Sequence, residues 1–385
     1  MKFFHLSDLH IGKQLYHYNM SDEQRDILRQ IVAFAKEEHP DAVIIAGDIY
    51  DVPVPSAEAV SIFDEFLSAL NAIEPQVAVL LIAGNHDSAR RIDFASSILK
   101  KHAVHIAGMP PVRREEHLKK VTFTDAYGEV DVYLLPFVKP GYVRNLFDED
   151  ISSYDMAVRK VIEREAIDWN KRNVIVSHQF YTASGVAPRT CDSEIKVVGG
   201  IENVDTGILD RFDYAALGHI HRTQKMGREE NRYCGTPLQY SVSEAGEQKS
   251  ITVVNLAEKG KSPVITSIPL RPMRQIRRLE GTLDQILSSV TEDIRGDYVS
   301  IVLTDEVEPY QPKERLEANF DSILEIRIDN SRTRQLLDFS EEKLEDLNPY
   351  EAFCTFFSEM NGRQMTEAED AVIREVIHRE TEAGV

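Results

Sequence analysis

The chain has 385 residues, of which 42% are hydrophobic and 28% are charged, and its formal net charge is −20. This length exceeds the roughly 250–300 residues that one hydrophobic core usually serves, so we expect one large domain and at least one smaller one. The longest apolar stretches fall far short of the ~20 residues that span a bilayer, which excludes a membrane-spanning protein and predicts a cytoplasmic one. The negative net charge argues against a surface that binds polyanions by charge alone.

Short apolar runs alternate with helix-length segments over the first 221 residues. These runs lie at 3–6, 42–47, 77–84, 132–137, 173–178 and 214–221. Strands that are apolar along nearly their whole length are buried on both faces, which is typical of a sheet covered by helices. The pattern therefore predicts an α/β fold.

The pattern changes after Pro272. A second set of elements is predicted in the order strand, helix, strand, helix, strand, at 276–281, 283–289, 298–305, 312–320 and 323–330. This order is enough for a small β-α-β-α-β domain. The segment contains no cluster of residues with metal-ligand chemistry.

Two short amphipathic helices are predicted at the end of the chain. The first begins with Asn348 as a cap and Pro349 at its first position, and its bulky apolar residues share one face. The second begins with a capping box formed by Thr366 and Glu369. These helices either pack on each other and on the rest of the chain or bind a partner.

Polar side chains with metal-ligand chemistry stand at the ends of the apolar runs. They are Asp8, His10, Asp48, Asn85, His178, His219 and His221. Because the carboxyl ends of strands in an open α/β sheet meet at one edge, we expect these seven side chains to gather there. The spacing of Asp8 and His10, like that of His219 and His221, directs both members of each pair to one side of an extended chain.

Seven ligands exceed the need of one transition-metal ion and suit two ions that share a bridging carboxylate. Carboxylate, amide and imidazole ligands without thiolate favour manganese, iron or zinc over calcium, with manganese preferred for a hydrolytic pair. The three cysteines stand far apart with no CxxC motif, so they predict neither a thiolate zinc site nor a disulfide framework. Taken singly, Asp48 and Asn85 could be turn residues and His178 a core histidine, but their joint occurrence favours a metal centre.

His86 remains beside Asn85 as an eighth candidate. A histidine next to a metal-held phosphoester can donate a proton to the leaving oxygen or stabilise charge in the transition state. The alternative is a hydrogen bond within its own loop. Asp51 could accept a hydrogen bond from the His86 imidazole and orient it, and Asp87 is the competing candidate for this role.

These motifs occur in the order D-x-H at 8–10, GD-x-x-D at 47–51, GNHD at 84–87, His178, and GH-x-H at 218–221. In this order they resemble the calcineurin-like metallophosphoesterase superfamily. Within it, segments 191–200, 212–224 and 233–250 resemble the SbcD family, the nuclease subunits of SbcCD complexes. The resemblance covers nearly the whole chain.

The resemblance implies a metallophosphoesterase β-sandwich flanked by helices, with a small α+β cap domain and a C-terminal helical pair. The implied boundaries are 1–270 for the phosphoesterase (nuclease) domain, 271–335 for the capping domain that helps admit DNA, and 336–385 for the partner-binding helices. One manganese ion would be held by Asp8, His10, Asp48 and His221, and a second by Asp48, Asn85, His178 and His219. His86 matches the catalytic histidine of the family.

The implied activity is that of a manganese-dependent DNA nuclease, acting as a double-strand exonuclease and a single-strand or hairpin endonuclease in DNA repair, recombination and replication. The implied partners are DNA, an SMC-type ATPase like SbcC bound through the C-terminal helices, and a second copy of the nuclease subunit. Such a protein would be cytoplasmic, and associated with the nucleoid when bound to DNA.

Basic residues near the same sheet edge are candidates for contacts with DNA phosphates. They are Lys13, Arg90, Arg91 and Arg189, and each could instead be a solvated or structural residue. A small-molecule phosphodiesterase or a phosphatase could use the same ligand set. Val52 and Pro53 follow the GD-x-x-D motif where protein phosphatases of the superfamily carry Arg-Gly, which argues against that branch. The complete ligand set argues against a non-catalytic scaffold for DNA ends.

Overall fold

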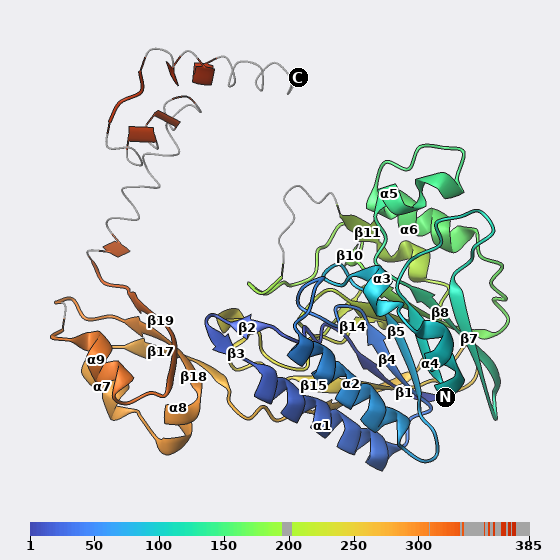
Figure 1. Ribbon diagram of the computed structural model, residues 1–385, viewed down its shortest axis with the longest axis horizontal. Helices are drawn as coiled ribbons and strands as arrows, with labels where there is room; N and C mark the ends of the chain where they lie inside the picture. Colours follow the sequence, from blue (N-terminus) through green and yellow to red (C-terminus); the bar gives the residue numbers. More distant parts are fainter. Residues whose placement is uncertain are drawn as a thin grey trace. The chain divides into compact units, whose positions relative to one another are not determined.

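The computed structural model describes residues 1–194, 202–307, 309–331 and 333–334, and further on residues 350, 353–354, 357–358, 363–366, 369–370 and 372–374 (Figure 1). The chain forms two compact units, one of residues 1–278 with 296–300, and the other of residues 279–295 with those from 301 onward. Among the described residues, no helix is long and apolar enough to cross a membrane.

Two mixed six-stranded sheets form the larger unit. The first has the order β16-β15-β1-β4-β5-β6, with β1 (Lys2–Leu6), β4 (Ala42–Ala46), β5 (Ala78–Ile82), β6 (Val104–Ala107), β15 (Ser250–Asn255) and β16 (Val264–Pro269). The second has the order β13-β14-β12-β9-β8-β7, with β7 (Lys119–Asp125), β8 (Gly128–Leu135), β9 (Arg172–His178), β12 (Tyr214–Gly218), β13 (Gln224–Met226) and β14 (Arg228–Tyr233). In each sheet four neighbouring strands are parallel, and the outer pairings β1-β15-β16, β7-β8 and β13-β14 are antiparallel.

Helices and short strands surround these sheets. The helices are α1 (Ser21–Glu38), α2 (Ala57–Asn71), α3 (Ala89–Ile92), α4 (Ser96–Leu99), α5 (Pro140–Val143) and α6 (Tyr154–Glu163). The short strands are β2 (Gln14–Leu15) with β3 (Tyr18–Asn19), and β10 (Phe180–Thr182) with β11 (Asn203–Asp205). Figure 1 shows α1 and α2 packed side by side. Their apolar faces are buried, and most of their charged residues face outward, with Glu23 of α1 as a buried exception.

The strands are apolar on both faces because each sheet packs against two layers. Phe3 and Ile44 of the first sheet share one hydrophobic cluster with Val132 and Val174 of the second, so this cluster fills the space between the sheets. Alternate residues of the second sheet, such as Ile175, belong to another cluster that includes the buried face of α6. This two-sided burial explains the near-continuous apolar runs of the sequence.

The predicted α/β fold and the β-sandwich that the resemblance implies are both confirmed. Only the single open sheet expected from the apolar runs themselves differs from the structure. The six apolar runs form β1, β4, β5, β8, β9 and β12, but these strands belong to two facing sheets and not to one open sheet. Six strands of the two sheets, β6, β7, β13, β14, β15 and β16, are missing from the prediction. Every residue of β7 and β16 is exposed or half-buried, so these two strands lack the continuous apolar run by which the other strands were predicted.

The predicted small β-α-β-α-β segment is confirmed as well. A three-stranded sheet of order β17-β18-β19 is built from β17 (Ile276–Gly281), β18 (Tyr298–Leu303) and β19 (Ser322–Ile328), with α7 (Leu283–Ser288), α8 (Glu292–Gly296) and α9 (Pro312–Glu317). Helix α8 is an addition to the predicted order. Most of the predicted C-terminal helical pair lies outside the described residues. The capping box predicted for its second helix is present, since the Thr366 main-chain N–H donates to Glu369 Oε2 at 2.8 Å and the Glu369 main-chain N–H donates to Thr366 Oγ1 at 3.4 Å.

A buried arginine joins the ends of several strands. The Arg172 guanidinium, at the start of β9, donates to both carboxylate oxygens of Asp125 at 2.9 and 2.5 Å. It also donates to the carbonyl oxygens of Gly128 at 2.7 Å and Ala257 at 2.9 Å. The N-terminal ammonium of Met1 pairs with the same carboxylate. The hydrogen bond from Arg172 holds the pKa of Asp125 well below its usual range.

We predict that Asp125→Asn lowers the free energy of unfolding by about 3 kcal/mol at pH 7, because it leaves a buried guanidinium without its anion. Since the pKa of Asp125 is lowered in the folded chain, this stabilisation is present above about pH 4 and is lost as the pH falls further. Urea unfolding of both proteins at pH 7 and pH 3 measures the difference.

The matched control is Asp148→Asn, which removes the carboxylate of the exposed pair between Arg114 and Asp148. Its urea midpoint should stay at the wild-type value, because exposed ion pairs contribute little. Equal midpoints for Asp125→Asn and the wild-type chain at pH 7 would contradict the role given to the buried pair.

Candidate metal centre

The predicted ligands follow the carboxyl ends of strands from both sheets. Asp8 and His10 follow β1, Asp48 follows β4, and Asn85 follows β5, all in the first sheet. In the second sheet, His178 ends β9, while His219 and His221 follow β12. The structure brings all seven together at the place where the two sheets meet.

The backbone at this place is held in an unusual conformation. Asp8, His10, Asp48 and His219 have φ angles of 53°, 44°, 49° and 103°, which side-chain-bearing residues rarely adopt. Two main-chain hydrogen bonds hold the first loop, from Asp8 N–H to Gly47 O at 3.0 Å and from His10 N–H to Asp48 O at 3.1 Å. Backbone strain of this kind persists where the surroundings enforce it and is concentrated at functional sites.

Two glycines allow the strand ends to approach one another. A Cβ atom at Gly84 would lie 2.2 Å from Asp48 Oδ1, and one at Gly218 would lie 1.9 Å from the carbonyl oxygen of Ala46. Neither distance is compatible with a side chain. The absence of a side chain at these two positions is therefore a condition for the compact arrangement of ligands.

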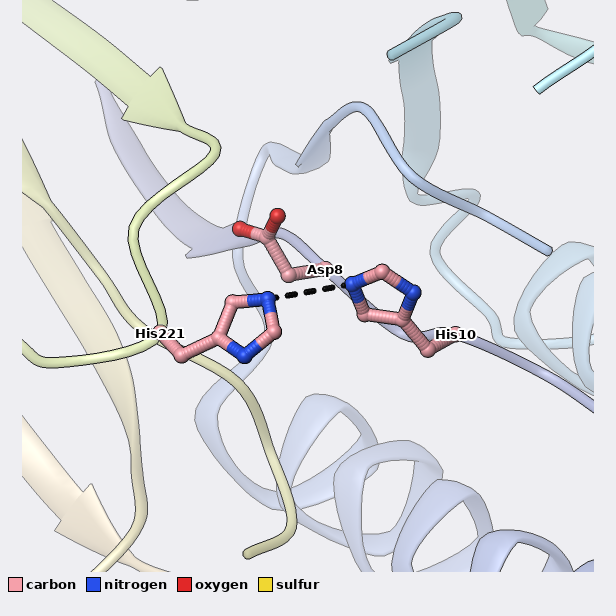
Figure 2. A group of neighbouring side chains, drawn as sticks. All are labelled: Asp8, His10 and His221. Carbon is pink, nitrogen blue, oxygen red and sulfur yellow. Dashed lines mark hydrogen bonds between the residues drawn. The ribbon is translucent and has the colours of Figure 1, made fainter. Parts of the chain in front are cut away.

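The first ligand cluster contains Asp8, His10 and His221 (Figure 2). All three are buried, and one ligand atom from each lies within 4.8 Å of the others. Figure 2 shows the Nε2 atoms of His10 and His221 turned toward each other, 3.1 Å apart. The Nδ1 atom of His10 lies 3.2 Å from Asp51 Oδ1, a carboxylate that can only accept. The contact is an ion-pair approach without hydrogen-bond geometry, and the carboxylate favours a ring proton on Nδ1 and a lone pair on Nε2.

The second ligand cluster contains Asp8, Asp48 and His178, with Asn85 beside them. His178 Nδ1 donates to the carbonyl oxygen of Ala46 at 2.7 Å, so its Nε2 carries a lone pair in the neutral ring. That atom faces Asn85 Oδ1 at 3.0 Å and Asp48 Oδ2 at 3.3 Å, which are both acceptors. Three acceptors this close need a positive charge among them, so the donor set fits a divalent cation.

The pKa shifts describe the same electrostatic situation. Burial lowers the pKa of His178, but the charge of Asp48 outweighs it and raises the pKa to about 9. Burial raises the pKa of Asp8, whereas the surrounding imidazoles hold the pKa of Asp48 far below its usual range. Burial lowers the pKa of His219 to about 3. The negative field that favours a proton on His178 favours a metal cation in the same way.

His86 lies at the edge of the centre and is half-buried. Its main-chain N–H donates to Asp48 Oδ1 at 2.9 Å, and its Nδ1 donates to the main-chain carbonyl oxygen of Asp51 at 2.8 Å. The His86 and His10 rings meet edge to face, with their centroids 4.9 Å apart. The imidazole is therefore fixed beside the ligands, with Nε2 left as its second functional atom.

The carboxylate proposed to orient His86 has a different position from the one expected. Asp51 supplies its carbonyl oxygen to His86, while its carboxylate contacts His10 and accepts from Lys13 Nζ at 2.9 Å. The competing candidate, Asp87, is buried and accepts main-chain N–H groups at 2.9–3.1 Å from the neighbouring loops. Neither carboxylate binds the His86 ring. The spacing of the motif placed Asp51 nearby, but a sequence cannot tell a carbonyl contact from a carboxylate contact.

The basic candidates for phosphate contacts are in different environments. Lys13 is half-buried and paired with Asp51, whereas Arg90 and Arg91 are exposed on α3. Arg189 is exposed, and its main chain is tied to the Gln224 side chain by two hydrogen bonds of 2.8 and 3.0 Å. Of the four, the three arginines have exposed side chains, whereas the Lys13 side chain is engaged by Asp51.

Sequence reasoning missed a row of polar residues behind His221. They are Ser193, Glu194, Glu244 and Lys249, which contact His221 directly or through one another. They come from two segments that served only to identify the family resemblance. Carboxylates and hydroxyls scattered through loops carry no signal of their own, because nothing in their spacing shows that they meet behind one ligand.

Comparison with known proteins gives two family matches and several relatives. The calcineurin-like phosphoesterase model matches residues 1–223, and the model of the type 5 capsule protein repressor C-terminal domain matches residues 269–361. The chain is 28% identical over 385 residues to the SbcD subunit of nuclease SbcCD from Staphylococcus epidermidis, covering 98% of both proteins.

Two solved structures illustrate more distant similarity. A dimetal phosphatase from Danio rerio is 13% identical with a TM-score of 0.39, covering 70% of this chain and 96% of that one. GAP50, the anchor in the inner membrane complex of Plasmodium, is 10% identical with a TM-score of 0.37, covering 86% of this chain and 98% of that one.

The phosphoesterase match covers more than half of the chain and contains both ligand clusters and His86. The buried carboxylates and imidazoles at the meeting point of the sheets agree with a metal-dependent hydrolase. The chain therefore belongs to the calcineurin-like phosphoesterase family, the metallophosphoesterases.

Proposed function

We propose that this chain is a manganese-dependent DNA nuclease, the nuclease subunit of an SbcCD-type complex in DNA repair and recombination. The observation that carries the proposal is the pair of buried ligand clusters that share Asp8, at the end of two facing sheets. Similarity to the SbcD subunit of nuclease SbcCD over 98% of both chains supports DNA as the substrate. Both exonuclease action on duplexes and endonuclease action on single strands or hairpins belong to this proposal.

We assign the ligands to two cations. Asp8, His10, Asp48 and His221 would hold one, and Asp48, Asn85, His178 and His219 the other, so that Asp48 would serve both. Two such cations supply Lewis acidity and neutralise the negative charge of a phosphodiester. The contacts of Asp48 with both His10, at 3.8 Å, and His178, at 3.3 Å, support its bridging position.

His86 is assigned to the leaving group of the phosphodiester. Its Nδ1 is held by the Asp51 carbonyl, so Nε2 can carry and deliver a proton to the departing oxygen. Its main-chain N–H binds the proposed bridging carboxylate, which fixes the ring relative to both ligand clusters. Asp51 thus positions two histidines, His86 through its carbonyl oxygen and His10 through its carboxylate.

The partners proposed for the chain follow from its C-terminal part. The match at residues 269–361 and the similarity over the full length support an ATPase partner like SbcC, bound through the C-terminal helices at 336–385. We also propose that residues 271–335 form a cap that helps admit DNA, and that two copies of the chain associate.

We predict that the purified chain with manganese cleaves a labelled linear duplex and a hairpin, and that His86→Gln lowers this cleavage by about 10²–10⁴-fold through loss of the proton donor. The measurement is single-turnover cleavage followed on denaturing gels, with a small chromogenic phosphodiester assayed in parallel. The matched control is His117→Gln, since His117 is exposed and pairs with Glu165. Turnover of the small ester alone, even with the ATPase partner and ATP present, would replace the nuclease by a small-molecule phosphodiesterase.

We predict that manganese raises the midpoint of thermal unfolding of the wild-type chain in a concentration-dependent way, because it binds the folded state only. Asp48→Asn should abolish most of this response, since the residue serves both cations. The control is Asp131→Asn, which removes another buried carboxylate, paired with Lys120 at 3.0 Å, and should keep the manganese response. A full response in Asp48→Asn would contradict the bridging assignment.

We predict that Arg90→Ala and Arg91→Ala each weaken DNA binding and reduce the slope of log affinity against log salt by about 0.9, the value for one lost phosphate contact. Fluorescence anisotropy across a salt series measures both quantities. Lys259→Ala is the control. Lys259 pairs with Asp213, and Asp213 precedes β12, whereas His219 follows β12, so this pair lies at the opposite end of the strand from the candidate ligand. Slopes unchanged from wild type would remove these arginines from the DNA surface.

A further inference from the structure

The candidate ligand His221 has hydrogen-bond partners at its main chain and at its ring. Its main-chain N–H donates to Glu194 Oε1 at 2.6 Å, and its carbonyl oxygen accepts from Lys249 Nζ at 3.0 Å. Its ring Nδ1 lies 2.7 Å from the hydroxyl oxygen of Ser193. Every polar atom of His221 except Nε2 therefore has a partner behind the metal centre, and Nε2 is the atom that faces His10.

Glu244 determines which partner donates in the hydrogen bond between Ser193 and His221. The Ser193 hydroxyl donates its single proton to Glu244 Oε1 at 2.9 Å, because a carboxylate can only accept. The proton between Ser193 and His221 must then come from the imidazole. Nδ1 of His221 carries the hydrogen, and Nε2 carries the lone pair that a metal requires.

Glu244 is held as an acceptor by its own surroundings. It is fully buried, and its carboxylate accepts from Lys249 Nζ at 2.6 Å and from the Ser241 hydroxyl at 2.8 Å. The adjacent ammonium of Lys249 balances its charge in this buried place. The same lysine also binds the carbonyl of His221, so the buried ion pair fixes both the backbone and the ring of this ligand.

Two of the other candidate histidine ligands, His178 and His10, reach the same tautomer by simpler means. A main-chain carbonyl accepts from His178 Nδ1, and a carboxylate lies beside His10 Nδ1, and neither group can donate. The hydroxyl of Ser193 can donate or accept, so by itself it would allow either tautomer of His221. Its bond to Glu244 removes that freedom.

We propose that Ser193, oriented by the buried Glu244–Lys249 pair, is a positioning residue that fixes His221 in its Nδ1–H tautomer and presents Nε2 to a divalent cation shared with Asp8 and His10. The inference rests on the proposed function only in taking His221 as a metal ligand. It assigns a role to the segment around Ser193 that family membership alone does not give.

The test is isothermal titration of the metal-free full chain with manganese. We expect Ser193→Ala to weaken one of two binding events by about 10–100-fold, the usual effect of removing an outer partner of a metal ligand, and to leave the other unchanged. Ser193→Thr keeps the hydroxyl and should restore most of the affinity. The control is Ser241→Ala, which removes another hydroxyl from the same Glu244 oxygen without touching His221.

A second readout reports the tautomer itself. In the metal-free chain, ¹⁵N shifts of labelled histidine should show His221 as the Nδ1–H form in the wild type and move toward the Nε2–H form in Ser193→Ala. Wild-type manganese affinity at both sites in Ser193→Ala, or an Nε2–H ring in the wild type, overturns the inference while leaving the proposed function intact. A wild-type chain that binds no manganese overturns both.

Discussion

Acceptor atoms that face one another at a buried position, where only a proton or a cation can join them, are the constraint on which this site depends. The lone pair of His178 Nε2 meets Asp48 Oδ2 at 3.3 Å and Asn85 Oδ1 at 3.0 Å inside a buried space. Such a group is unfavourable by itself, because buried acceptors need donors or cations. The strained backbone at Asp8 and His10 and the missing side chain at Gly84 make sense as the means of holding this group together.

The same arrangement directs three of the four candidate histidine ligands toward the centre. In His178, His10 and His221, an acceptor lies behind the ring beside Nδ1 and leaves Nε2 for the metal side, although the acceptors differ. They are a main-chain carbonyl, a partly exposed carboxylate and a hydroxyl backed by a buried ion pair. Ligand geometry is therefore set by the second row of residues, which connects the centre to strands, loops and charges well outside it.

The sequence allowed prediction of those features that leave a local pattern. Burial on both faces makes strands such as β4 and β5 continuously apolar, so both the strands and the polar residues after them could be located. The apolar pattern alone could not predict the division into two sheets, because pairing joins residues as far apart as Phe4 and Val253, and only the family resemblance implied it. The contact of His86 with a carbonyl, and not a carboxylate, depends on loop geometry and has no signature in residue type. The same holds for the row of residues behind His221.

A negatively charged chain and a negatively charged DNA substrate are compatible if the proposed cations occupy the metal centre. The chain carries a formal net charge of −20, and the centre itself contains the carboxylates of Asp8 and Asp48. Without cations, this place would repel a phosphodiester. Two divalent ions reverse the local sign, so attraction of DNA to the scissile position and readiness for hydrolysis would arise from the same binding event. The negative surface elsewhere would then disfavour contacts that do not reach the centre.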